Sequence, residues 1–223
     1  AGLNLTVPNV VGEAAILEAI SRVWASPFSA RAFAWRQAQM DRPEHVYPAV
    51  LLMRAVDADK SGVMVTADVA TGARNTLTVA VNEGVGGAVE GQSAESLRID
   101  RKTGEIRLMA VATAPFRRQL APAGGLREVP ASGADFVLRR SETDALLRLA
   151  DELPAKFPPL VDANGAPVPA DIEFGFEDGE LRLFQIRPFL DSETARASAF
   201  LANLDAADPG TARALVDLDA PPR

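Results

Sequence analysis

Apolar and polar residues alternate along residues 171–188, and the alternation predicts a β-hairpin whose two faces differ in character. Residues two apart on a strand share a face. On the first strand one face is apolar, with Ile172, Phe174 and Phe176. The other face carries Asp171, Glu173, Gly175 and Glu177. On the return strand the residues that alternate are Leu183, Phe184, Gln185, Ile186 and Arg187.

The register of this hairpin decides which side chains meet. A two-residue turn at Asp178-Gly179 is the usual first choice, but it would place Glu173 opposite Phe184 and mix polar with apolar groups. A loop of three or five residues instead places Phe174 opposite Phe184. Because a slip of one residue moves every side chain to the other face, the pattern favours the odd loop.

In the favoured register one face gathers polar groups. Asp171 lies opposite Arg187 and Glu173 opposite Gln185, while Gly175 would leave room for a ligand beside them. Two carboxylates and an amide are oxygen ligands suited to Mg²⁺, and the planar fork of an arginine suits phosphate oxygens. The plainer alternative is a surface hairpin with cross-strand ion pairs.

The rest of the chain predicts an α+β fold, because helices and strands are intermixed without a regular βαβ rhythm. Helical spacing predicts a helix over 13–25, and Ser26-Pro27 should begin a second helix with Phe28 and Trp35 packed in a core. Ser141 should cap a helix that ends near residue 153. Strands are expected over 47–56, 62–67, 77–81, 96–100 and 105–112.

Loops are expected over 114–134 and 157–169, and helices over 191–204 and 211–215. Together these elements form one domain. It has a helical entry segment over 1–45, a sheet-and-helix lobe over 46–190 and a helical tail over 191–223.

Composition excludes several classes of site. The chain of 223 residues has no cysteine, so it holds no disulfide and no thiolate site. Its net charge of −7 argues against nucleic-acid binding. Neither a membrane-spanning run nor a signal peptide is visible, which favours a cytoplasmic protein without a membrane partner. The single histidine, His45, lies between prolines and is expected to be structural.

Five segments, taken in order, resemble the nucleotide-binding domain shared by phosphoenolpyruvate synthase, pyruvate phosphate dikinase and related dikinases. They are Val-Trp-Ala-Ser at 23–26 with the helix at 31–36, the strand-loop-strand signature at 56–68 with Thr71-Gly72, Gly-Val-Gly at 84–86, Asp-Arg-Lys-Thr-Gly-Glu at 100–105, and the hairpin pair Asp171-x-Glu173 and Gln185-x-Arg187-Pro188.

The resemblance implies the C-terminal lobe of an ATP-grasp fold, a mostly antiparallel sheet flanked by helices. Such a domain binds Mg-ATP and passes a phosphoryl group to a histidine on a separate domain. By resemblance, Asp171 and the catalytic Arg187 hold the phosphates. Glu173 and Gln185 bind the metal, with Asp171 as a further metal ligand.

The resemblance also places adenine against the backbone of Met53, Arg54 and Ala55. The family usually has Gln at residue 53, Met at residue 55 and an acidic residue at Gly87, and Val69 stands where it has Pro. These departures mark a divergent member.

Two alternatives remain: a nucleotide-binding or regulatory module without transfer activity, and a purely structural interaction domain. Because Ala1-Gly2 resembles the middle of a family motif, the chain is expected to be a fragment. Its missing partners would be an N-terminal lobe and a phosphohistidine domain, so the chain alone should be inactive.

Overall fold

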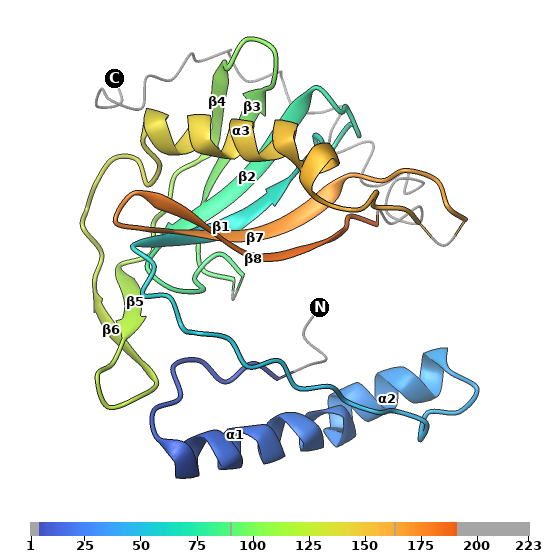
Figure 1. Cartoon of the computed structure of the whole chain (residues 1–223). Helices are drawn as coiled ribbons and strands as arrows, with labels where there is room; N and C mark the ends of the chain where they lie inside the picture. Colours follow the sequence, from blue (N-terminus) through green and yellow to red (C-terminus); the bar gives the residue numbers. More distant parts are fainter. Residues whose placement is uncertain (1–4, 90, 163, 191–223) are drawn as a thin grey trace. The chain divides into compact units, whose positions relative to one another are not determined.

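The computed structural model describes residues 5–89, 91–162 and 164–190. Its elements follow one another as shown in Figure 1. They are α1 (Glu13–Ala25), the 3₁₀ helix η1 (Ser26–Phe28), α2 (Ala30–Gln39), β1 (Lys60–Val65), β2 (Thr76–Glu83), β3 (Glu95–Asp100), β4 (Ile106–Ala110), β5 (Phe116–Leu120), β6 (Leu126–Pro130), α3 (Arg140–Lys156), β7 (Ala170–Glu177) and β8 (Glu180–Pro188).

The described residues form a six-stranded sheet of order β4-β3-β2-β1-β7-β8 and a two-stranded sheet of β5 and β6. Every neighbouring pair in the larger sheet is antiparallel. Strand β1 lies inside this sheet because it pairs with β2 on one side and with the much later β7 on the other. The predicted class, an α+β lobe with a mostly antiparallel sheet, is confirmed.

The core lies between one face of the large sheet and helix α3, which crosses that face in Figure 1. Met64, Val79 and Leu97 present fully buried side chains from three adjacent strands. Phe174 and Phe176 extend the core onto β7, where their rings meet edge to face with centroids 5.8 Å apart. The apolar face predicted for the first hairpin strand is therefore buried.

Helix α3 begins at Arg140, so Ser141 is not its cap. Glu142 organises this end instead: its carboxylate accepts the backbone N–H of Arg139 at 2.7 Å and the ammonium of Lys60 at 2.6 Å. A glutamate three residues after the cap can satisfy a free N–H at the start of a helix, which a hydroxyl already inside the first turn cannot do. The same carboxylate ties the helix to β1.

A buried carboxylate also holds the segment that enters α3. Glu95 is 0% exposed and accepts the backbone N–H groups of Val137 and Leu138 at 2.7 and 3.1 Å. Burial raises the pKa of Glu95 above its ordinary value of 4.5, although the two N–H donors and Lys60 oppose that shift.

The chain divides into two compact units, residues 1–57 with 119–128, and residues 58–118 with 129–223. The expected domain boundaries at 45 and 190 stay a prediction. In the first unit helix α1 has the predicted bounds, but α2 begins only at Ala30, after the 3₁₀ turn that Ser26-Pro27 starts.

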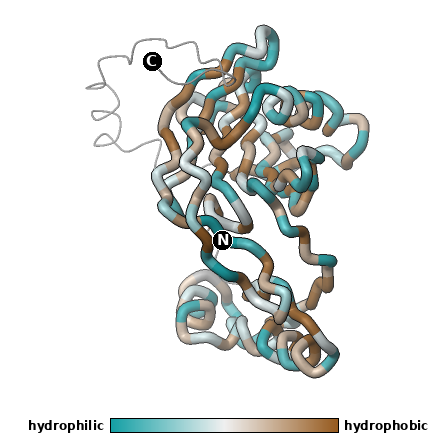
Figure 2. The backbone as a smooth tube through the Cα atoms, turned by 90° about the vertical axis from the view of Figure 1, so that its left-hand side faces the viewer, coloured by the Kyte–Doolittle hydropathy of each residue, from teal (hydrophilic) through white to brown (hydrophobic). Residues whose placement is uncertain are grey.

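The expected aromatic core of the first unit is wrong, because Phe28 and Trp35 are 59% and 49% exposed. Arg36 is buried in their place. Its guanidinium donates to the carbonyl groups of Pro27 and Pro43, and it lies 5.6 Å from the centres of the Phe28 and Phe33 rings. Figure 2 shows apolar positions along both helices as well as along the sheet.

Two further expectations are corrected. Residues 47–56 form no strand among the described residues, because a run of apolar residues does not by itself supply a neighbouring strand. Residues 114–134 hold the β5–β6 hairpin rather than a loop. Its turn uses Gly124 and Gly125 at positive φ, and Asn9 donates to the carbonyls of Ala121 and Gly125.

The loop over 157–169 is found with only an isolated bridge between Val161 and Pro167. The helices expected over 191–204 and 211–215 lie outside the described residues. In the part of the chain that the structure describes, no helix is long and apolar enough to cross a membrane.

Candidate functional site

The β7–β8 hairpin brings the predicted polar quartet together. Asp171 pairs with Arg187 and Glu173 with Gln185 in the strand register. Directly paired residues share a face of the sheet, and the intervening Ile172 belongs to the buried face against α3. The four polar residues therefore lie on the face opposite α3, as the sequence predicts.

The loop that produces this register differs from the expectation. Asp178-Gly179 forms a two-residue turn, with φ of 52° and 78°. The register then shifts between Glu173 and Phe174, so that Phe184 is an extra residue on β8. A β-bulge of this kind sets two residues of one strand against one residue of the other. The bulge, and not an odd loop, brings Gln185 and Arg187 onto the face of the carboxylates.

Asp171 and Arg187 form an ion pair. The guanidinium Nε and Nη2 atoms approach the same oxygen, Oδ2, at 2.7 and 2.6 Å. The side chain of Asp171 is 14% exposed and that of Arg187 is 42% exposed. Since both contacts use one oxygen, Oδ1 accepts no hydrogen bond from the described residues. Oδ2 of Asp171 is thus occupied by Arg187, whereas Oδ1 has no hydrogen-bond donor among the described residues.

Glu173 and Gln185 are the neighbouring pair on the same face. Glu173 is half-buried and Gln185 is exposed. The described residues hold no group of three or more His, Cys, Asp or Glu placed to bind a metal. A cation bound by these side chains would therefore take two carboxylates and an amide and complete its coordination from outside this set.

Phe184 and Gly175 depart from the prediction. The ring of Phe184 lies over Gly175: a Cβ atom added to Gly175 would meet its Cζ atom at 2.7 Å. Gly175 shares its face with Glu173, so the ring stands on the polar face and not in the core as expected. The room for a ligand expected over Gly175 is filled by this ring.

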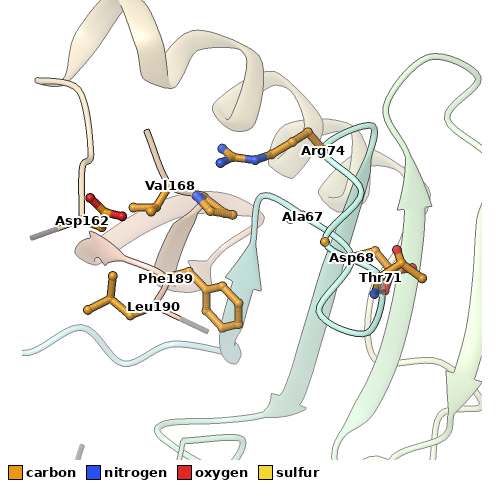
Figure 3. A pocket seen from close by; sticks show the side chains of 10 residues that line it. Ala67, Asp68, Thr71, Arg74, Asp162, Val168, Phe189 and Leu190 are labelled. Atoms are coloured by element: carbon orange, nitrogen blue, oxygen red, sulfur yellow. Dashed lines mark hydrogen bonds between the residues drawn. The ribbon is translucent and has the colours of Figure 1, made fainter. Parts of the chain in front are cut away.

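A pocket of about 460 Å³ begins two residues beyond the ion pair, where Pro169 and Phe189 join by a backbone hydrogen bond of 2.8 Å. Figure 3 shows Arg74 extending its guanidinium toward the segment that carries Val168, and Arg74 donates to the carbonyl of Pro167 at 2.8 Å. The pocket has the size of a small-molecule site. Its lining is Ala67, Asp68, Thr71, Gly72, Arg74, Asp162, Val168, Pro169, Phe189 and Leu190.

Asp68 shapes one wall of this pocket. Its Oδ1 atom accepts the N–H groups of Ala70 and Thr71, and its Oδ2 atom lies 3.4 Å from Nε of Arg98. Aspartate at such a position holds a turn by binding the backbone two and three residues later. The sequence indicates this segment through the family resemblance alone, although an Asp before a Gly-containing turn is itself a signal for such a loop.

The glycine segment at 84–86 is held by Ser61, a residue the sequence prediction did not single out. The Ser61 hydroxyl donates to the carbonyl of Gly84 at 2.6 Å and accepts the N–H of Gly86 at 2.8 Å. Gly87 is tightly packed, because an added Cβ atom would lie 2.4 Å from Oε1 of Gln92. A side chain at position 87, such as the acidic one usual in the resembled family, would require the Gln92 side chain to move and Asn82 to give way.

Met53, Arg54 and Ala55 belong to the other compact unit. All three are exposed, and no backbone hydrogen bond between described residues uses their N–H or C=O groups. Whether they meet the same ligand as the hairpin stays a prediction.

Comparison with known proteins gives the family. The model of the pyruvate phosphate dikinase AMP/ATP-binding domain matches residues 1–205, nearly the whole chain. This chain belongs to that family. The match includes every described segment discussed above, so the quartet and the pocket lie within a dikinase-type AMP/ATP-binding domain.

Several curated proteins are similar to this domain. A rifampicin phosphotransferase from Streptomyces sviceus is 33% identical over 84% of the chain and 21% of its own length. The phosphoenolpyruvate synthase of Pyrococcus furiosus is 27% identical over 84% of the chain and 24% of its own length. The prodigiosin synthesizing transferase PigC of Serratia marcescens is 29% identical over 94% of the chain and 23% of its own length. The chain thus spans about a fifth to a quarter of these relatives.

Proposed function

We propose that this domain is the ATP-binding lobe of a phosphoenolpyruvate synthase-like phosphotransferase, with the phosphoryl acceptor on another part of the protein. The observation that carries the proposal is the hairpin quartet, in which an ion-paired aspartate and arginine lie beside a glutamate and a glutamine. Membership in an AMP/ATP-binding family supports a nucleotide as the ligand.

In this proposal Arg187 binds phosphate oxygens. On binding, the Arg187 guanidinium either leaves Asp171 for the phosphate oxygens or donates to Asp171 and to a phosphate oxygen at the same time. Arg187 is 42% exposed and can reach a ligand, but Asp171 is only 14% exposed, so the exchange requires a cation to take over the charge of the Asp171 carboxylate. A guanidinium keeps its charge at any physiological pH and can bind two oxygens at once.

Glu173, Gln185 and the free Oδ1 atom of Asp171 would hold Mg²⁺. All are hard oxygen donors on one face, which fits this cation and leaves coordination positions for phosphate oxygens. Bound there, Mg²⁺ would neutralise charge that develops on the transferring phosphoryl group.

The backbone of Met53, Arg54 and Ala55 is proposed to bind the adenine edge. Its N–H and C=O groups make no hydrogen bond within the described residues, so they are available to a ligand. This role depends on backbone atoms and would survive the unusual side chains at residues 53 and 55.

A nucleotide-binding module without transfer activity is the second candidate. The observation that favours it is Gly87 itself, which stands where the family usually has an acidic residue and is buried against Gln92 and Asn82. Transfer of label from β- or γ-labelled ATP to the full-length protein separates the two candidates. Label on His45 would contradict both, since each places the acceptor outside this chain.

Calorimetric titration of the full-length protein with Mg-ATP tests the proposed site. Arg187→Ala should weaken ATP binding about 10- to 150-fold, the loss of one charge-assisted contact of about 1.5–3 kcal/mol, and should weaken Mg²⁺ binding less. Arg182→Ala is the matched control, because Arg182 is on the same strand, is ion-paired and is 41% exposed. Equal losses in the two variants would refute the assigned role.

A further inference from the structure

The β7–β8 hairpin combines a turn and a quartet that demand different registers. The turn residues Asp178 and Gly179 both have positive φ, as a tight two-residue turn requires. From this turn the pairing runs without interruption from Glu177 opposite Glu180 to Phe174 opposite Leu183. Continued unchanged, it would set Asp171 opposite Ile186, and Arg187 would leave the face of the carboxylates.

The bulge at Phe184 resolves the conflict. One extra residue on β8 shifts the pairing, after which Asp171 lies opposite Arg187. Residues that form such a bulge oppose a single partner together, so Phe184 and Gln185 both face Glu173. The quartet therefore exists only on the far side of the bulge from the turn.

Gly175 provides the space that the bulge needs. An added Cβ atom would lie 2.7 and 2.9 Å from two ring carbons of Phe184 and 3.1 Å from Cβ of Ala58. Its φ is not in the positive range, so the backbone would accept alanine and the requirement is for space alone. A ring over an unsubstituted strand position fills a gap that the pleated surface would otherwise leave.

We propose that Gly175 and Phe184 are positioning residues: the ring of Phe184 packs into the space over Gly175 and thereby fixes the bulge that aligns Gln185 and Arg187 with Glu173 and Asp171. That these two residues set the strand register is inferred from the hairpin geometry alone. Its consequence for ligand binding rests on the proposed function.

Cysteine cross-linking reads the register directly, because the chain contains no cysteine of its own. Asp171→Cys with Arg187→Cys reports the bulged register, since these residues are paired. Asp171→Cys with Ile186→Cys reports the slipped register, because the two side chains now point to opposite faces. Disulfide formation requires Cβ atoms about 3.5–4.5 Å apart, so each pair should cross-link only in its own register.

In the unaltered background the 171/187 pair should cross-link under mild oxidation and the 171/186 pair should not. Gly175→Ala should cause loss of the 171/187 cross-link. In a Phe184→Ala background the same Gly175→Ala change should have no further effect, because the ring that the methyl group strikes is gone. Phe184→Ala removes a half-buried side chain and should itself weaken the 171/187 cross-link, so it tests the proposal if Gly175→Ala alone does not fold. An equal effect of the methyl group with and without the ring would overturn the proposal, as would an unchanged cross-link in Gly175→Ala.

Titration of the full-length Gly175→Ala protein with Mg-ATP separates this proposal from the function on which it builds. Affinity should fall about tenfold or more, as expected when a charge-assisted contact is lost. A changed cross-link with unchanged ATP affinity would uphold the register lock and refute the nucleotide site. An unchanged cross-link would refute the register lock whatever the affinity.

Discussion

Strand β7 carries three carboxylates and the segment 47–56 only one charged residue, Arg54, yet it is the more polar β7 whose apolar side chains are buried. Strand β7 pairs with β1 and β8, and Ile172 and Phe174 on it are completely buried. The segment 47–56 pairs with nothing among the described residues, and Tyr47 and Leu51 are 90% and 80% exposed. The comparison shows that a pattern sets which side chains share a face, whereas burial requires a neighbour.

The largest expected effect lies in the strand with neighbours. Phe174→Ala should lower the free energy of unfolding by about 3–5 kcal/mol, because it removes a fully buried ring from a close-packed core. Denaturant titration of the chain measures this. A loss below about 1 kcal/mol would mean that β7 is no better packed than the exposed segment.

Gly62→Ala should cause the next largest loss in the free energy of unfolding. A Cβ atom at Gly62 would lie 2.2 Å from the carbonyl oxygen of Ala80, a backbone atom that cannot move aside without shifting β2. Overpacking of this kind typically costs about 1–3 kcal/mol. Ala49→Val, which also enlarges a side chain but in the exposed segment, is the control and should leave the melting temperature nearly unchanged.

The pH dependence of stability tests a buried group in the core, the carboxyl of Glu95. Burial raises the pKa of Glu95, so its contribution to stability is present below pH 4.5 and is lost as the pH rises through the raised pKa. At low pH Glu95→Gln should cost no more than about 1 kcal/mol, because the amide has the size of the protonated carboxyl and still offers a carbonyl oxygen to the backbone N–H groups of Val137 and Leu138. That deficit should shrink as the pH rises, and thermal melts from pH 4 to 8 would show the trend. A constant or growing deficit would contradict it.

The smallest effect belongs to the segment without neighbours. Leu51→Ser should change the stability of the isolated chain by no more than about 0.5 kcal/mol, because the side chain is already in water. The same substitution in the full-length protein measures whether the segment gains a partner there. A cost above about 2 kcal/mol in the isolated chain would show that residues 47–56 are packed after all.

The sequence predicted elements correctly where a repeating apolar pattern extended over many residues and where the pairing strand was near in the chain. Helix 13–25, the strands that became β1 to β4 and the two faces of β7 followed from spacing alone. The pairing of Asp171 with Arg187 and of Glu173 with Gln185 was also predicted, because segregating polar from apolar groups allows only one alignment at that end of the hairpin.

The failures have separate physical causes. The odd loop was wrong because a bulge can restore a polar face that the Asp178-Gly179 turn would disrupt, and no periodicity encodes a bulge. The β5–β6 hairpin was missed because each strand is only five residues long and the intervening Gly and Pro residues dominate the composition. Phe28 and Trp35 were placed in a core because aromatic character does not reveal how much neighbouring mass is available.

The strand order also has a consequence for synthesis on the ribosome. Strands β1 to β4 follow one another in the chain and in the sheet, so they can pair as they emerge. The other edge of β1 must wait for β7, which is translated only after helix α3. During that interval the nascent sheet presents the open edge of β1 to other chains. The β7–β8 hairpin, which carries the whole polar quartet, then covers that edge.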